Sequence, residues 1–216
     1  MDPNGVRPAR PGWPALPIFD SSTTGAASAS SRTAFIVVDA EGLVLDTDGS
    51  YWVSDEYGPY IYHFNAKSPS KLIGVTAPPR AFLPLDAAGQ LDFTSVTNPK
   101  SGRVVGQGFE GLTMDFQTRT LYAMLQSALV QDGGADESGA ETDTTSRYTR
   151  LTAFDASRRS GDLSLKGEWI VPLPRSSSKN KTRASSEILF VGDGTFLTYA
   201  RDGDGRGGNG DKSSTK

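Results

Sequence analysis

Asp39-Ala40-Glu41-Gly42-Leu43 and Gly108-Phe109-Glu110-Gly111-Leu112 each open one of two stretches of this chain that run in parallel. A degenerate third copy is Ser186-Glu187-Ile188-Leu189. Each phrase leads through a polar turn to a hydrophobic strand, and these strands are Tyr51-Trp52-Val53-Ser54-Asp55, Leu121-Tyr122-Ala123-Met124-Leu125 and Thr195-Phe196-Leu197-Thr198-Tyr199. A unit that recurs in this way, with a carboxylate at the same place, indicates a repeat architecture made of β-strands.

Outward from these phrases, alternating apolar and polar residues predict further strands, with turns such as Asp48-Gly49 and Asp193-Gly194 between them. The first unit has predicted strands at 40–45, 51–54, 60–64 and 72–76, the second at 111–115, 121–125, 148–154 and 168–171, and the third at 188–191 and 196–199. Four antiparallel strands in roughly 40 residues is the size of one propeller blade. The sequence therefore predicts an all-β partial β-propeller of about two and a half four-stranded antiparallel blades.

Closed propellers have at least about four blades, and a blade buries its faces against its neighbours. We therefore expect the remaining propeller blades to be missing from this chain, and the isolated chain to be marginally stable and inactive. Pairing with a second copy is the weaker alternative.

The predicted domain organisation has one ordered body with unstructured ends. Residues 1–31 are rich in Pro and Ser and are predicted to be disordered, although Trp13, Leu16, Ile18 and Phe19 could dock on a neighbouring surface. Residues 32–202 form the partial propeller domain, with a mobile surface insertion at 127–147. Residues 203–216 are a disordered tail rich in Gly and Asp.

Composition excludes several classes of protein. The 216 residues have 36% hydrophobic side chains, 24 Gly and 13 Pro, which favours short strands and many turns. The formal net charge of −3 argues against nucleic acid and acidic membrane surfaces as partners. No apolar run approaches the roughly 20 residues of a membrane-spanning helix, and the N-terminus has no hydrophobic signal-peptide core. Cysteine is absent, which excludes disulfides and thiolate sites.

Three glutamates are the predicted catalytic residues. Glu41, Glu110 and Glu187 each stand at the start of the first strand of a unit, and the innermost strands of a propeller line its channel, so these side chains should converge. Converging carboxylates repel one another and must take up a proton, pair with a base or hold a hard cation such as Ca²⁺. The alternative is that each acid binds backbone amides of the next blade and has a purely structural role. Gly42 and Gly111 indicate close backbone approach beside them.

Asp55 and Glu56 form a second candidate site, because adjacent carboxylates at the end of a strand suit metal ligation by a loop. The alternative is a turn with solvated acids. His63 is the single histidine and alternates with apolar residues, which predicts a half-exposed strand position. Without cysteine a zinc site is not expected, and no Gly-x-Ser-x-Gly motif supports a serine esterase.

The chain resembles the phytase-like family, also called the esterase-like domain of phytase, over about residues 36–202. The most specific pieces are Trp52-Val53-Ser54-Asp55-Glu56-Tyr57-Gly58-Pro59 and Gly108-Phe109-Glu110-Gly111-Leu112, and a third, weaker block pairs Ser186-Glu187-Ile188 with Tyr199-Ala200-Arg201-Asp202. The long insertion and Gln126 are more similar to fungal members. The resemblance implies an exported β-propeller with conserved acids facing a common surface. It places family acids at Glu41, Asp55, Glu56, Glu110, Glu187 and Asp202, and it adds Asp202 to Asp55 and Glu56 as a predicted metal ligand.

Two functions follow as hypotheses. The first is a phytase-like hydrolase, in which Ca²⁺ held by the channel carboxylates assists hydrolysis of a small-molecule phosphate ester. An ester as charged as inositol hexakisphosphate could bind such an acidic site only through bridging cations. The second is a non-catalytic propeller module that presents its loops to a protein or glycan partner. The second gains support because the sequence shows no nucleophile–base pair.

Overall fold

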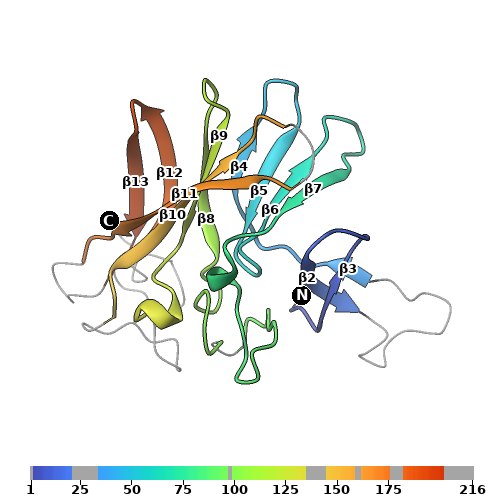
Figure 1. Ribbon diagram of the computed structural model, residues 1–216, viewed down its shortest axis with the longest axis vertical. Coiled ribbons are helices and arrows are strands. Elements are labelled where there is room, and N and C mark those ends of the chain that lie inside the picture. The colour runs from blue at the N-terminus through green and yellow to red at the C-terminus, as the bar shows by residue number, and fades with distance from the viewer. Residues whose placement is uncertain are drawn as a thin grey trace, which may run out of the picture.

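The computed structural model describes residues 2–20, 34–96, 99–134, 145–158, 162–175 and 182–201, which form a set of antiparallel sheets (Figure 1). The strands are β1 (Gly5–Pro8), β2 (Ala15–Asp20), β3 (Ala34–Ile36), β4 (Ala40–Leu45), β5 (Tyr51–Asp55), β6 (Ile61–Phe64), β7 (Leu72–Thr76), β8 (Phe109–Asp115), β9 (Thr120–Leu125), β10 (Tyr148–Asp155), β11 (Ser164–Pro172), β12 (Ala184–Gly192) and β13 (Thr195–Arg201). Two short 3₁₀ turns, η2 (Arg80–Phe82) and η3 (Val130–Asp132), accompany them. Within these ranges no helix has the length and apolar character needed to cross a bilayer.

The strands follow the predicted units. Sheet β4-β5-β6-β7 and sheet β8-β9-β10-β11 each have four strands in chain order, and β12 and β13 form a two-stranded sheet. The all-β prediction is therefore confirmed, and every predicted strand exists with its ends shifted by a few residues at most. The predicted turns are also present: Gly49 has a φ of 81°, and Asp193 and Gly194 both have positive φ. Such turns match the twist of the strands that they join.

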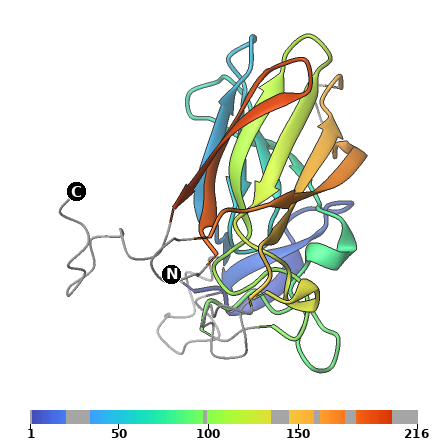
Figure 2. The same cartoon turned by 90° about the vertical axis from the view of Figure 1, so that its left-hand side faces the viewer.

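The first strands of the three sheets lie next to one another. Strand β8 contacts β4 on one side and β12 on the other, so the sheets stand side by side (Figures 1 and 2). An apolar cluster that includes Val44, Trp52, Leu112 and Met114 fills the space between the first two sheets. A smaller cluster that includes Met124, Leu151 and Ile188 joins the second sheet to β12–β13. Burial between neighbouring sheets is what holds this arrangement together.

Glycine permits the close approach of these first strands. A Cβ atom on Gly42 of β4 would lie 2.6 Å from Cβ of Leu112 in β8. A Cβ atom on Gly111 of β8 would lie 2.7 Å from the backbone nitrogen of Ile188 in β12. Real side chains cannot occupy such space without displacing backbone. The predicted reason for glycine in the two repeated phrases is therefore confirmed.

The prediction of disorder over residues 1–31 is wrong for residues 2–20. Strands β1, β2 and β3 form an antiparallel sheet, and the side chains of Leu16 and Ile18 are buried against Tyr60 and Tyr62 of the next sheet. Tyr60 donates a hydrogen bond to the Ala15 carbonyl oxygen at 2.6 Å. Trp13 packs against the same cluster, so the expected docking of this apolar set occurs. The prolines of this segment hide the alternation that would predict the pairing of β1 with β2, and the neighbouring sheet stabilises that pairing. Residues 21–31 lie outside the described residues.

Two further predictions need correction. His63 is fully buried, not half-exposed, and its ring stacks on Trp52 with centroids 3.6 Å apart. Alternation predicts a solvent face only where one face of a sheet is free, but here both faces of the sheet are covered. In the predicted mobile insertion 127–147, Ala128 and Leu129 are buried, and Ser146 donates from its backbone to Gly133 at 2.7 Å. Residues 135–144, Asp202 and the predicted tail 203–216 lie outside the described residues.

Candidate functional site

Three carboxylates meet where the β4–β5 hairpin begins and ends. Asp39 and Glu41 flank the first residue of β4, and Glu56 directly follows β5. The ladder pairs Ala40 with Asp55, and the Glu56 amide donates to the Asp39 carbonyl oxygen at 3.0 Å. One carboxylate oxygen from each of the three acids lies within 4.8 Å of the other two. Antiparallel pairing therefore brings together acids that are far apart in sequence.

A β-bulge helps to place Glu41. The register of β4 against β5 shifts between Ala40 and Leu43, so the Glu41-Gly42 pair lies opposite the single residue Ser54. Ser54 Oγ accepts a hydrogen bond from the Gly42 amide at 2.8 Å and donates to the Glu110 carbonyl oxygen at 3.0 Å. A bulge re-aims the side chains next to it, and bulges are frequent beside functional sites.

Glu110 extends the triad towards the second sheet. Its carboxyl group shares a hydrogen bond with that of Glu56, and its side chain is almost completely buried. Oε1 accepts from Nη2 of Arg201 at 2.8 Å, whereas Oε2 receives no bond from an N–H or hydroxyl group of the described residues. Burial first, and then the adjoining carboxylates of Glu110 and Glu41, raise the pKa of Glu56 to about 9. Glu56 therefore carries a proton at neutral pH unless a cation replaces it.

Asp55 lies apart from this cluster, although it was predicted as a metal ligand. Its carboxylate is fully buried and accepts bonds from the amides of Asp39 at 2.9 Å and Tyr57 at 3.0 Å. The Gly58 amide and the Tyr62 hydroxyl donate to its other oxygen. Burial raises the pKa of Asp55 to about 6, and these hydrogen bonds oppose the rise. With both oxygens engaged, Asp55 organises the turn that carries Glu56, and its complete burial also differs from the solvated acids of the alternative.

Glu187 does not join the other two predicted catalytic acids. Glu41 and Glu110 both lie against Glu56, but Glu187 is exposed and its Oε1 accepts from the amide of its own neighbour, Ile188, at 2.8 Å. Of the three predicted catalytic glutamates, Glu41 and Glu110 therefore share Glu56 as a neighbour, and Glu187 does not. A register shift between Ser185 and Glu187 changes the alternation of β12 at this point. Asp202, the third predicted metal ligand, lies outside the described residues.

Sequence reasoning missed three residues of this region. Asp39 is the first residue of the first repeated phrase, but it was not selected, because Glu41 is the acid that recurs in the other phrases. Arg201 was quoted only as part of a family block. Arg103 is buried, and its guanidinium donates to the carbonyl oxygen of Tyr57 at 2.8 Å and to that of Phe93 at 3.3 Å. Burial lowers the pKa of Arg103 to about 10. A single arginine in a polar turn gives no periodic signal from which such a role could be predicted.

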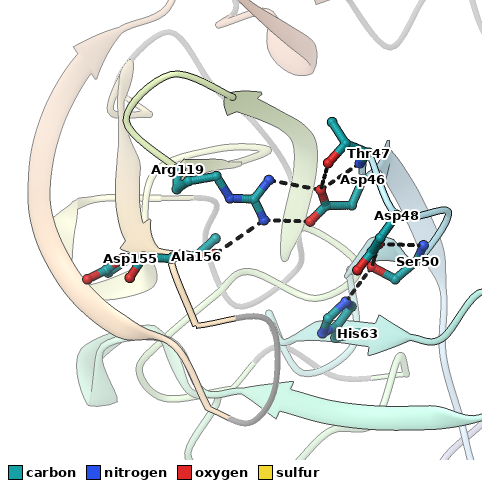
Figure 3. A network of polar contacts seen from close by, with 9 residues as sticks. Asp46, Thr47, Asp48, Ser50, His63, Arg119, Asp155 and Ala156 are labelled. Atoms are coloured by element: carbon teal, nitrogen blue, oxygen red, sulfur yellow. Dashed lines mark hydrogen bonds and ion pairs between the residues drawn. The ribbon is translucent and has the colours of Figure 1, made fainter.

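A second polar network lies at the other end of β4 and is structural (Figure 3). Arg119, in the β8–β9 turn, donates two hydrogen bonds to Asp46 at 2.8 and 2.6 Å and a third to the Ala156 carbonyl oxygen at 3.3 Å. These bonds hold the pKa of Asp46 far below its ordinary value. His63 contacts Ser50 Oγ at 3.1 Å beside this pair. The network ties the turns of neighbouring sheets together and includes no residue of the acid cluster.

The acid cluster has the chemistry of a site for a hard cation. Ca²⁺ prefers six to eight oxygen ligands at 2.3–2.6 Å and is commonly bound by carboxylates. Asp39 and Glu41 are exposed and Glu56 is half-buried, so an ion could reach them from solvent. Oε2 of Glu110 is buried and accepts no hydrogen bond from an N–H or hydroxyl group of the described residues, which provides a further observation that this part of the site can take a ligand.

Comparison with known proteins supports the resemblance seen in the sequence. An uncharacterized secreted protein of Arthroderma benhamiae is 31% identical over 213 residues, and the alignment covers 89% of this chain. The chain spans only 40% of the length of that curated relative. No solved structure matches the chain significantly. The phytase-like family, described as esterase-like activity of phytase, matches residues 20–213. Because this match extends over nearly the whole sequence, the chain belongs to the phytase-like family.

Proposed function

We propose that this chain carries the cation centre of a phytase-like hydrolase that acts on phosphate esters, with Asp39, Glu41 and Glu56 as the residues that hold Ca²⁺. The observation that carries the proposal is the approach of these three carboxylates to within 4.8 Å. Family membership supports a hydrolase in general terms. Carboxylates at this separation repel one another, and a bound cation would relieve that repulsion.

We further propose that the sheets are blades of a propeller that this chain only partly contains. The contacts of β8 with β4 and β12 support this, because the first strands of blades surround a common axis. The greater length of the A. benhamiae relative is in line with more blades in the whole protein. That relative is named a secreted protein, and we propose export for the intact protein that contains this chain.

The roles of the residues follow from their charges. A bound Ca²⁺ would polarise the phosphate group and screen its charge. The ion would be held in place by Asp39, Glu41 and Glu56 and would thereby orient the substrate bound to it. Glu56 would release its proton when it binds the ion. Glu110, which is paired with Arg201, would limit the movement of Glu56 through the hydrogen bond between their carboxyl groups. Without a cation, the charged carboxylates of the cluster would repel a phosphate dianion, so metal and substrate binding should be linked.

Phosphate release by the full-length gene product tests this function. We expect turnover of inositol hexakisphosphate or a simple aryl phosphate in Ca²⁺ and its loss with chelator. The double substitution Glu41→Gln and Glu56→Gln should abolish turnover while the protein stays folded. Glu168→Gln is the matched control, because Glu168 is an exposed acid on β11 that pairs with Arg150 at 2.8 Å and takes no part in the acid cluster. Absence of chelator-sensitive turnover in the wild type would end the hydrolase proposal.

The alternative is a non-catalytic module that binds a partner or acts as a scaffold. The state of the single histidine favours it, because His63 is buried against Trp52 and takes no part in the acid cluster. Asp55 and Glu187 also bind backbone amides, as a structural role requires. Calcium binding without any turnover in the assay above would select this alternative.

A further inference from the structure

One arginine contacts the acid cluster through Glu110. Arg201 is the last residue of β13, and its Nη2 donates to Glu110 Oε1 at 2.8 Å. The two side chains differ greatly in exposure, since that of Arg201 is 37% exposed and that of Glu110 is 1% exposed. Glu110 is thus the buried partner of the ion pair, and Arg201 is the partner that solvent can reach.

The guanidinium group retains capacity for another ligand. It has five N–H donors in a rigid fork, and the contact with Glu110 uses one of them. Planar guanidinium groups match phosphate oxygens and favour charge-assisted bonds with them. Glu110 links Arg201 to the Asp39–Glu41–Glu56 triad, because its carboxyl group contacts both Arg201 and Glu56.

We propose that Arg201 is the residue that recognises the phosphate group of the substrate. A phosphate with one oxygen on the cation has other oxygens free, and Arg201 binds one of these while it remains paired with Glu110. The inference rests on the proposed cation centre and adds to it a specificity for dianionic phosphomonoesters. A neutral ester would gain nothing from this arginine, because the charge-assisted bond requires an anion.

The competing explanation is that Arg201 only neutralises the buried charge of Glu110. A buried carboxylate without its partner is costly, so removal of Arg201 would then lower stability and would weaken anion binding only indirectly, through the unpaired charge of Glu110. The two explanations differ in what the double variant Glu110→Gln with Arg201→Met should do. If Arg201 serves only Glu110, loss of both groups restores phosphate affinity. If Arg201 binds phosphate, affinity stays low.

Calorimetry on the full-length gene product separates these explanations. The probe is phenylphosphonate, a non-hydrolysable dianion, titrated in saturating Ca²⁺, with Ca²⁺ affinity measured separately for each variant. We expect Arg201→Met to weaken phenylphosphonate binding by about tenfold or more, since bonds to charged groups are strong, with Ca²⁺ affinity almost unchanged. Arg201→Lys, which keeps the positive charge beside Glu110, should weaken phenylphosphonate binding less than Arg201→Met does. Arg150→Met is the matched control, because Arg150 is a partly exposed arginine paired with Asp132 and Glu168.

The outcomes distinguish failure of the inference from failure of the proposed function. Unchanged phenylphosphonate affinity in Arg201→Met, with Ca²⁺ still bound, would overturn the inference and leave the cation centre standing. Recovery of affinity in the double variant would also overturn it. Absence of Ca²⁺ binding in the wild type would overturn the proposed function itself. If Arg201→Met does not fold, the comparison of Arg201→Lys with wild type decides, and equal affinities there would contradict the inference.

Discussion

Glu56 has the most strongly perturbed environment of the acid cluster. It is half-buried, shares a hydrogen bond with Glu110 and lies beside Asp39 and Glu41. Each of these features favours the protonated form. Perturbed acids of this kind occur often at functional sites, and also in structural networks, so the cluster needs a direct test of what it binds.

The pKa of Glu56 predicts how stability depends on pH when no cation is present. The pKa is about 9 in the folded protein against an ordinary value of 4.5, so the folded state binds the proton more tightly. This contribution to stability is fully present below about pH 4.5 and is lost as the pH rises through about 9. Urea unfolding midpoints in chelator should therefore fall with rising pH in the wild type and fall less in Glu56→Gln. Equal slopes in the two proteins would contradict the assigned environment, and Glu168→Gln is the control.

The site could be predicted from sequence only in part, and strand geometry explains the limit. Glu41 and Glu110 were found because they recur in the repeated phrase. Asp55 and Glu56 were predicted together, but successive residues of an extended chain point to opposite sides, so only one of them could face the cluster. The sequence does not show which one. Arg201 reaches Glu110 across two sheets, and no local pattern predicts a contact between residues 91 positions apart.

Strands β4 and β8 can lie close together because Gly42 has no side chain, and this predicts that a larger residue there lowers stability. Gly42→Ala would place a Cβ atom 2.6 Å from Cβ of Leu112. Overpacking of this kind costs about 1–3 kcal/mol of stability. Gly5→Ala in β1 is the control, because its Cβ would meet only the Ile18 carbonyl oxygen at 3.9 Å. Chemical denaturation compares the two, and equal stability of both variants would show that the sheets can separate without cost.

The Asp46–Arg119 pair should be a strong link between neighbouring sheets. The Asp46 side chain is completely buried and that of Arg119 is 18% exposed. Arg119→Met leaves a buried charge unpaired, which costs about 3–5 kcal/mol. Arg150→Met, which removes a more exposed pair, should cost about 1 kcal/mol or less. Thermal and urea unfolding at neutral pH give both values. If Arg119→Met lowers the free energy of unfolding no more than Arg150→Met does, the Asp46–Arg119 pair is not a strong link between the sheets.

The same pair predicts the behaviour of the protein in acid. Because Arg119 lowers the pKa of Asp46, the stabilisation is present above the unfolded pKa of about 3.8 and is lost as the pH falls through the folded value. The difference in stability between wild type and Arg119→Met should therefore narrow in strong acid.

Strand positions were predictable because alternation and turn residues are local signals. The hairpin β1–β2 was missed because Pro8, Pro14 and Pro17 hide the alternation of its residues, and the neighbouring sheet stabilises it. The burial of His63 was missed for a related reason, since the face of the sheet that it shares with Trp52 and Ile61 packs against the second sheet. Both errors concern packing between sheets, about which local sequence says little.

For the molecule as a whole, apolar side chains remain exposed on the first strands of the sheets and on the last hairpin, and Leu43, Leu45 and Leu189 line one open groove along β4, β8 and β12. Leu43 and Leu45 of β4 are each 65% exposed, and Leu189 of β12 with Leu197 and Tyr199 of β13 are 53–66% exposed. Exposed apolar surface and open strand edges promote association. In the intact protein we propose that further blades cover this apolar surface.

The isolated 216-residue chain should therefore self-associate and have no measurable hydrolase activity. Sedimentation velocity should show oligomers or aggregates, and replacement of Leu189 and Leu197 by Thr should increase the monomer fraction. The control replaces Ser157 and Arg158 by Thr, which changes exposed polar positions. A monodisperse wild-type monomer with a cooperative thermal transition would contradict this prediction, all the more if Ca²⁺ greatly raised its melting temperature.

The cation centre is tested most directly by anomalous diffraction from crystals of the full-length gene product soaked in Ca²⁺. We predict one strong peak at the start of β4, with an oxygen of Asp39, Glu41 and Glu56 each at 2.3–2.6 Å from it. The same experiment on Glu41→Gln with Glu56→Gln should show no peak there. An electron-density map in which these three carboxylates remain together and hold no ion at saturating Ca²⁺ would contradict the account.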